Sequence, residues 1–171
     1  VIIATCSRIT KRKRINLLLK KLKLLNKKVT VLLIGDGPER LNLEKQAKNL
    51  KLNLIITGFV GQKKVAEFLS ISDIFTILSI YDASPKALNE AMNFSIPIIA
   101  SEGVGTSEDL VINGVNGYIY RENEYDLLSK NLEFLILNKK KRKEMGGKNK
   151  HIINKYTLEK DVLNLMQIIN E

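Results

Sequence analysis

Two carboxylates, Asp82 and Glu90, bracket a short segment of the sequence that is typical of a loop entering a helix. In this segment Ser84 is a suitable helix N-cap, and Pro85 suits the first helical position. A helix N-terminus favours an anion because its first backbone N–H groups are unpaired and carry partial positive charge. We therefore expect the two carboxylates and the helix start to hold one ligand that has an anionic group.

Positive charge is concentrated at the start of the chain. Ten of the 28 Lys and Arg residues lie in the first 35 positions, which contain no Asp or Glu. The rest of the chain carries equal numbers of basic and acidic residues, so the net charge of +10 comes from this segment. Such a patch suits phosphate ligands, nucleic acid or an anionic membrane surface. A merely solvated face is an equal alternative for the lysines at 20–28.

Length and composition limit the classes of protein that the chain can belong to. Its 171 residues suit one domain, and no apolar run approaches the ~20 residues of a transmembrane helix. Cys6 and His151 are the sole residues of their types, which excludes an internal disulfide and a Cys/His zinc site. No signal peptide is visible, and a reduced, cytoplasmic setting is expected. Because Val1 already lies in an apparent strand, we expect a domain of a longer protein.

Apolar runs of strand length alternate with amphipathic stretches of helix length. Strands are expected at 1–5, 29–34, 52–57, 74–78 and 96–100, with an edge strand at 118–120. Helices are expected at 15–25, 38–50, 63–70, 85–92, 123–138, 139–154 and 157–170, with a short one after 103. This alternation indicates right-handed βαβ units. The predicted fold class is α/β, a Rossmann-like three-layer sandwich with a mostly parallel sheet of about six strands.

The polar segments that follow the predicted strands should meet at one edge of such a sheet. They are residues 8–13, 35–37, 58–62, 82–90 and 103–106. Open α/β sheets bind ligands at this carboxyl edge. The chain has neither G-x-G-x-x-G after its first strand nor G-x-x-x-x-G-K-[ST], which argues against the usual dinucleotide site and against a P-loop. Side-chain cations and a helix N-terminus must therefore bind the anion.

Six segments in order resemble the C-terminal half of retaining glycosyltransferases of family 4, the GT-B type. They are S-R-I-T-K-R-K-R, I-G-D-G-P-E-R, I-T-G-F-V, S-D-I-F-T-I-L-S, D-A-S-P-K-A-L-N-E-A-M and G-V-N-G-Y-I, and they extend with their spacing kept from Val1 to about Leu165. The resemblance implies that residues 1–171 are the donor-binding half of a GT-B fold, without the N-terminal acceptor domain. It also implies a UDP-, GDP- or ADP-sugar as substrate, with no metal and no other cofactor.

The resemblance implies three catalytic residues. Arg8 and Lys13 match the Arg and Lys that neutralise the departing diphosphate, which is electrostatic stabilisation of the transition state. Asp82 matches the acidic residue that contacts the donor sugar near the reacting carbon. The family usually has Glu there, so Asp82 has a reach shorter by one methylene.

The implied donor-binding residues lie on two segments. Glu90 matches the carboxylate that accepts hydrogen bonds from the ribose hydroxyls, and the amides near the start of its helix would face the phosphates. Backbone groups of the other segment would read the nucleobase, with an aromatic or aliphatic side chain covering its face, although Phe59 suits a core position equally well. The full set is Gly58, Phe59, Val60, Ser84, Pro85, Lys86, Ala87 and Glu90.

The expected function is retaining transfer of a sugar to an acceptor hydroxyl, in cell-surface polysaccharide, lipopolysaccharide or glycolipid synthesis. The isolated domain would bind the donor without turnover, and the basic first helix is compatible with contact at the inner face of the membrane. One alternative is a nucleic-acid-binding module, but no aromatic residue interleaves the basic run. A related GT-B epimerase or phosphorylase and a non-catalytic GT-B-like domain are further alternatives.

Overall fold

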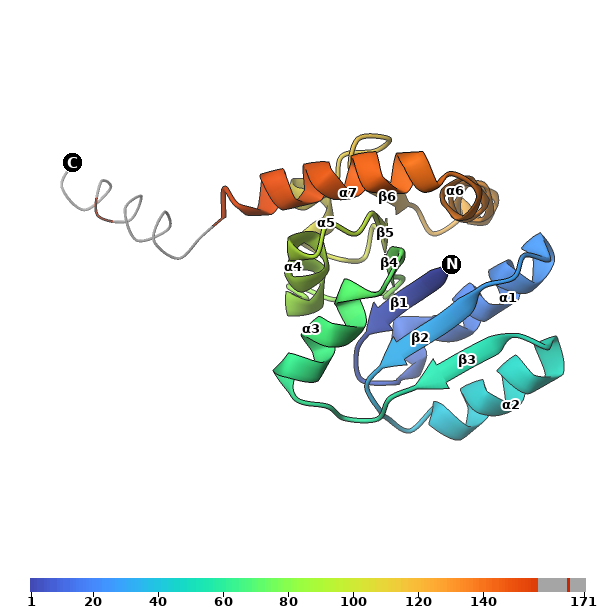
Figure 1. The fold of residues 1–171 in the computed structure, drawn as a ribbon. Coiled ribbons are helices and arrows are strands. Elements are labelled where there is room, and N and C mark those ends of the chain that lie inside the picture. The colour runs from blue at the N-terminus through green and yellow to red at the C-terminus, as the bar shows by residue number, and fades with distance from the viewer. Residues whose placement is uncertain (157–165, 167–171) are drawn as a thin grey trace.

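The computed structural model describes residues 1–156 and 166, and in them the chain forms a six-stranded, all-parallel sheet (Figure 1). The strand order is β3-β2-β1-β4-β5-β6, so β6 is an edge strand, as predicted. The strands are β1 (Ile2–Cys6), β2 (Thr30–Ile34), β3 (Asn53–Ile56), β4 (Ile74–Ile77), β5 (Ile98–Ser101) and β6 (Gly117–Tyr120). The predicted α/β class and Rossmann-like sheet are confirmed.

Helices cover both faces of the sheet (Figure 1). A 3₁₀ turn, η1 (Lys11–Lys13), precedes the helices, which are α1 (Ile15–Leu25), α2 (Arg40–Leu50), α3 (Gln62–Ser70), α4 (Lys86–Asn93), α5 (Ser107–Leu110), α6 (Tyr125–Leu137) and α7 (Lys139–Ile153). One core lies under α1, α2 and α6, and the other under α3, α4 and α5. The helix expected at 157–170 lies, apart from residue 166, outside the described residues.

The strands are apolar on both faces because each face packs against a core. Ile3, Val31 and Ile99 belong to the core under α1, whereas their neighbours Ala4 and Leu32 belong to the core under α4. Successive side chains of a strand point to opposite faces, so a strand that is covered on both sides reads as a continuous apolar run. This pattern is the reason that the sequence predicts the strands well.

Helix α7 crosses the amino ends of the central strands (Figure 1). Its Asn149 side chain is fully buried and donates to the Ile96 and Asn116 carbonyl oxygens at 2.7 and 2.8 Å. Asn116, also fully buried, donates back to the Asn149 oxygen at 2.7 Å. These bonds give each of the two buried amide side chains a partner inside the protein. They therefore hold the C-terminal helix and the turn before β6 in one arrangement.

Helix α4 begins one residue later than predicted. Its N-cap is Pro85, not Ser84, and Pro85 has an extended backbone (φ −75°, ψ 110°) without a side-chain capping bond. Because Pro85 itself lies outside the helical region, the first helical residue is Lys86. The prediction of Ser84 as the cap is therefore wrong. Helix α2 likewise begins at Arg40 rather than at 38, because the Glu39 amide donates to the Ile9 carbonyl at 3.3 Å.

Candidate functional site

The sheet order creates one switch point, between β1 and β4 (Figure 1). Chain connections leave these two strands in opposite directions, so the loops that follow them flank a crevice at the carboxyl edge. Lys13 follows β1 and Asp82 follows β4, and their side chains form an ion pair across this point. Only 11% of the Lys13 side chain and 18% of the Asp82 side chain are exposed. The structure therefore brings two of the three predicted catalytic residues into contact.

Backbone contacts fix the loop that carries Lys13. The Ile9 amide donates to the Asp36 carbonyl at 2.8 Å, and the Ile80 amide donates to the Arg12 carbonyl at 2.9 Å. Gly35 approaches this loop so closely that a Cβ there would lie 2.1 Å from the Ser7 carbonyl oxygen. The G-D-G turn after β2 is thus a packing partner of the cationic loop, since a side chain on Gly35 would displace that loop.

Asp82 is held from both sides by the loop that follows β5. Its amide donates to the Gly103 carbonyl at 2.8 Å, and its carbonyl accepts from the Gly105 amide at 2.9 Å. A Cβ at Gly103 would lie 2.0 Å from the Ile80 oxygen, and one at Gly105 would lie 2.5 Å from the Ala83 oxygen. The two glycines are therefore required for the close approach that positions Asp82, a role that the sequence alone did not assign.

The start of α4 is open to an anion. The described part of the chain offers no acceptor to the amides of Lys86 and Ala87, whereas the Leu88 amide already donates to the Pro85 carbonyl at 3.0 Å. Ser84 is exposed and Pro85 is partly exposed, so neither covers these two amides with a capping side chain. Such free N–H groups at a helix start form a ready anion site.

Glu90 lies on α4, close enough to the end of β1 to influence Cys6. Burial of the thiol, followed by the negative charge of Glu90, raises the pKa of Cys6 to about 11. Glu90 is partly buried, as is Lys13. A thiol with so high a pKa stays protonated near neutral pH, so Cys6 is a packing residue.

Arg8 lies at the same edge but is fully available to a ligand. It is exposed, and no ion pair or hydrogen bond of its guanidinium occurs within residues 1–156. Arg8 therefore lies in the same loop as Lys13, but it forms no ion pair or hydrogen bond with Lys13 or Asp82. A free guanidinium can donate two parallel hydrogen bonds to a phosphate.

The remaining predicted residues, Gly58, Phe59 and Val60, lie after β3, two strands away from β1. Gly58 adopts a positive φ of 73° and forms a bridge with Gly35. Phe59 is 79% exposed, so it is not a core residue, and its contact with a nucleobase stays a prediction. Val60 packs in part against the second core. The segment thus follows a strand of the same parallel sheet and lies at the same carboxyl edge as the ion pair.

Sequence reasoning missed Arg14, Glu122 and Tyr120, which adjoin the predicted site. Arg14 directly follows Lys13 and forms an ion pair with Glu122, which follows β6. A run of basic residues at 11–14 does not reveal which member has an acidic partner 108 residues away. Tyr120 ends β6 and is 1% exposed. A hollow of about 580 Å³ also lies beside β6, but none of the predicted site residues lines it.

Relatives of known class match this chain over most of its length. The family model described as Glycosyl transferases group 1 matches residues 1–152. MJ1178 of Methanocaldococcus jannaschii, an uncharacterized glycosyltransferase, is 31% identical over 144 residues, which are 81% of this chain and 40% of that protein. The chain therefore spans less than half the length of this relative.

Solved structures show the same fold. TarM of S. aureus, in complex with UDP, Fondaparinux and alpha-GlcNAc-glycerol, has a TM-score of 0.87 at 23% identity, over 99% of this chain and 35% of TarM. The C-terminal domain of a group 1 glycosyl transferase, LpcC of Francisella tularensis, has a TM-score of 0.80 at 21% identity, over 91% of this chain and 85% of that one. With 152 of its 171 residues matched, the chain belongs to the glycosyl transferases of group 1 and has the fold of the C-terminal domain of a GT-B glycosyltransferase.

Proposed function

We propose that this chain binds a nucleoside-diphosphate sugar and that the full-length enzyme transfers the sugar to an acceptor hydroxyl with retention of configuration. The observation that carries the proposal is the Lys13–Asp82 pair, which lies across the switch point of the sheet next to the free N-terminus of α4. TarM, which shares the fold, was solved with UDP. A cation, free amides and carboxylates in one crevice suit a ligand with both phosphates and hydroxyls.

The predicted site residues have different roles in the proposed reaction. Arg8, Lys13 and the amides of Lys86 and Ala87 would bind the diphosphate and stabilise its charge as it leaves. Asp82 would contact the sugar, and Glu90 the ribose hydroxyls. The acceptor hydroxyl would attack the anomeric carbon on the face from which the diphosphate departs, so a new glycosidic C–O bond forms as the C–O bond to phosphate breaks, and the hydroxyl proton passes to the departing phosphate oxygen.

The rest of the cleft would come from an acceptor domain elsewhere in the full-length protein, which would bind a glycan or glycolipid. This follows from the length of MJ1178 and TarM, of which this chain spans 40% and 35%. The domain alone should bind the donor weakly and should not turn it over. The cations and amides would stabilise the leaving group without a metal or another cofactor.

A titration of the chain with UDP, GDP and ADP at low salt tests the donor site. We expect saturable binding of one nucleotide, because the base segment would select among them. Arg8→Ala should weaken this binding about tenfold, which is a typical loss for one charge-assisted phosphate contact. Glu90→Ala should weaken it to a similar extent through the ribose. Calorimetry or NMR shifts would measure both effects.

Lys48→Ala is the matched control for this titration, because it removes one exposed charge from the last turn of α2, which leads to the amino end of β3 and not to the carboxyl edge. It should leave nucleotide affinity unchanged. If the chain binds none of the nucleotides but binds single-stranded nucleic acid tightly, the donor-site proposal is wrong and the nucleic-acid alternative is supported.

A second partner, an anionic membrane, is favoured by the outer face of α1 and α2. On α1, Lys20 and Lys23 are exposed beside Leu24, which is 73% exposed, and the helix contains no acidic residue. On α2, Leu41 is 78% exposed. Lysines around exposed leucines suit a surface of anionic headgroups over acyl chains. No helix of the described residues is long and apolar enough to cross a membrane.

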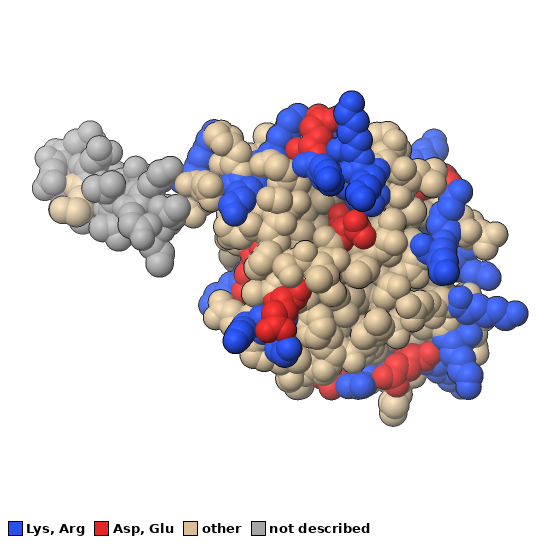
Figure 2. Space-filling model, viewed as in Figure 1, with Lys and Arg blue, Asp and Glu red and all other residues tan. Residues whose placement is uncertain are grey.

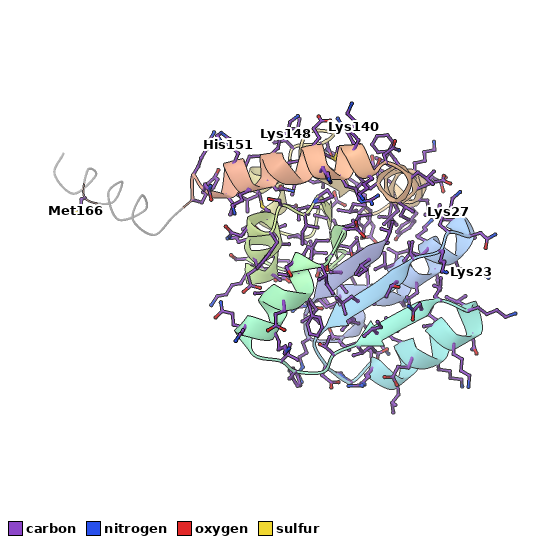
Figure 3. All side chains as sticks on the ribbon, in the orientation of Figure 1. Lys23, Lys27, Lys140, Lys148, His151 and Met166 are labelled. Carbon is purple, nitrogen blue, oxygen red and sulfur yellow. The ribbon has the colours of Figure 1, made fainter. Side chains whose placement is uncertain are left out.

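The figures show that this face is distinct from the other lysine-rich helix. Figure 3 places Lys23 and Lys27 at the end of α1, whereas Lys140 and Lys148 project from α7. In Figure 2 basic side chains gather over both places, at the right and at the top of the view. On α7 two of the lysines, Lys141 and Lys148, are paired with Glu144 on the same helix, at 3.0 and 3.4 Å. Part of the α7 charge is therefore neutralised locally.

Vesicle sedimentation tests the membrane face. The chain should bind vesicles of phosphatidylglycerol and phosphatidylcholine, and not phosphatidylcholine alone. The double variant Lys20→Gln/Lys23→Gln should lower partitioning about tenfold or more, since each lysine near an anionic surface contributes about 1 kcal/mol. The variant Lys140→Gln/Lys148→Gln removes the same charge from α7 and should have a smaller effect. Equal losses would indicate attraction by net charge, without a defined face.

A further inference from the structure

Arg14 has a backbone conformation that an arginine rarely adopts. Its φ and ψ are 51° and 31°, in the left-handed region, and it is the N-cap of α1. Two of the other non-glycine residues with positive φ, Asn26 and Lys51, are C-caps of α1 and α2, where this conformation is usual. Arg14 has the same role for the 3₁₀ turn η1, because its amide donates to the Lys11 carbonyl at 3.1 Å and closes that turn. Residue 14 therefore ends the turn that carries Lys13 and begins α1.

The Arg14 side chain joins two loops of the site. Its guanidinium pairs with Glu122, whose carboxylate also accepts from the Tyr125 hydroxyl at 3.3 Å and whose amide donates to the Glu102 carboxylate at 2.9 Å. The hydrogen bond from Arg14 lowers the pKa of Glu122. Burial raises the pKa of the neighbouring Tyr120 hydroxyl, and the Arg14 charge acts in the opposite direction. The loop after β1 is thereby tied to the loops after β5 and β6.

The turn that carries Lys13 is therefore held at both ends. On one side the Arg12 carbonyl accepts from the Ile80 amide at 2.9 Å, which joins the turn to the loop after β4. On the other side, Arg14 joins it to Glu122. Lys13 lies between these two attachments, with its ammonium group on Asp82. A shift of the turn at either attachment would move the ammonium group relative to the crevice.

We propose that Arg14 is a positioning residue, which acts with Glu122 to hold the Lys13 ammonium group where the diphosphate binds. In this proposal the guanidinium of Arg14 stays on Glu122 and acts on the phosphate only through the position of Lys13. The positive φ at residue 14 turns the chain so that Lys13 points toward Asp82 while the next side chain reaches the loop after β6. This inference rests on the proposed nucleotide site.

The test compares stability with nucleotide affinity in Arg14→Gly. Glycine adopts a positive φ without strain, so the melting temperature should stay the same or rise. Affinity for the bound member of UDP, GDP and ADP should fall about tenfold, because the Lys13 turn loses one attachment. Glu122→Gln should cause a similar loss. The double variant should bind no more weakly than either single variant, since both remove the same link.

The outcomes separate this inference from the proposed function. A melting temperature that holds while affinity falls, with non-additive losses, supports positioning by Arg14. Unchanged affinity in Arg14→Gly and Glu122→Gln, with normal binding by the unaltered chain, overturns the inference and leaves the proposed function intact. Additive losses also overturn it, because Arg14 would then contact the ligand independently of Glu122. If the unaltered chain binds none of the three nucleotides, both proposals fail.

Discussion

Replacing Lys13 by alanine in the full-length protein is expected to lower kcat for sugar transfer about 10²–10³-fold, as removal of one preorganised group from a developing negative charge does. The ammonium group lies across the switch point on Asp82, with 11% of the side chain exposed. Its environment is therefore largely shielded from solvent, where a charge acts more strongly than in water. The measurement is release of the nucleoside diphosphate from the sugar conjugate of the nucleotide that binds in the titration.

Lys11→Ala is the matched control, because Lys11 belongs to the same 3₁₀ turn and carries the same charge but is exposed to solvent. It should change kcat less than about threefold, as for an exposed charge that is screened by salt. Lys13→Arg should retain part of the activity because the cation is kept. Equal losses in Lys11→Ala and Lys13→Ala would contradict a specific role of Lys13 and would indicate general attraction by the basic loop.

The second large effect is expected at two adjacent glycines of α7. A Cβ on Gly146 would lie 1.8 Å from the carbonyl oxygen of Ser95, whereas a Cβ on Gly147 meets no atom within 4 Å. Gly146→Ala should lower the free energy of unfolding by about 3 kcal/mol, because the helix must move away from the loop before β5. Gly147→Ala should raise it by up to about 1 kcal/mol, because alanine favours a helix over glycine. Urea unfolding of the three chains measures both.

The contrast between these neighbours tests how α7 packs. Both substitutions add one methyl group to the same helix, so a general effect of helix propensity would change stability in the same direction. If Gly146→Ala is as stable as Gly147→Ala, α7 does not lie against Ser95 as described. If both are destabilising, the exposed side of the helix at Gly147 has a partner.

The sheet and the positions of its loops could be predicted from the sequence. The apolar run Ile74–Ile77 is buried on both faces, so its composition alone reveals a central parallel strand. Parallel strands carry their following loops to one edge, so Lys13 and Asp82 were expected together although 69 residues separate them. The motif resemblance supplied their expected roles, together with those of Arg8 and Glu90.

The sequence preference for N-cap residues did not predict the first residue of α4 correctly. Ser84 before Pro85 has the pattern of a capping residue, but the Asp82 backbone is bonded on both sides by Gly103 and Gly105. The chain bends at Ala83, Pro85 is extended, and the helix begins at Lys86. The backbone bonds of Asp82 to Gly103 and Gly105 join segments some 20 residues apart, and the local capping preference of Ser84 does not include them. As a result, the Lys86 and Ala87 amides are left open.

The sequence by itself determined the α/β class, the mostly parallel sheet of about six strands and the edge at which the charged loops gather, because periodicity is a property of short segments. Only the tertiary structure decided which basic residue of the run 11–14 has which partner. Lys13 pairs with Asp82 and Arg14 with Glu122. The acidic partners of these adjacent side chains lie 69 and 108 residues away in the sequence, so only the folded chain brings them together.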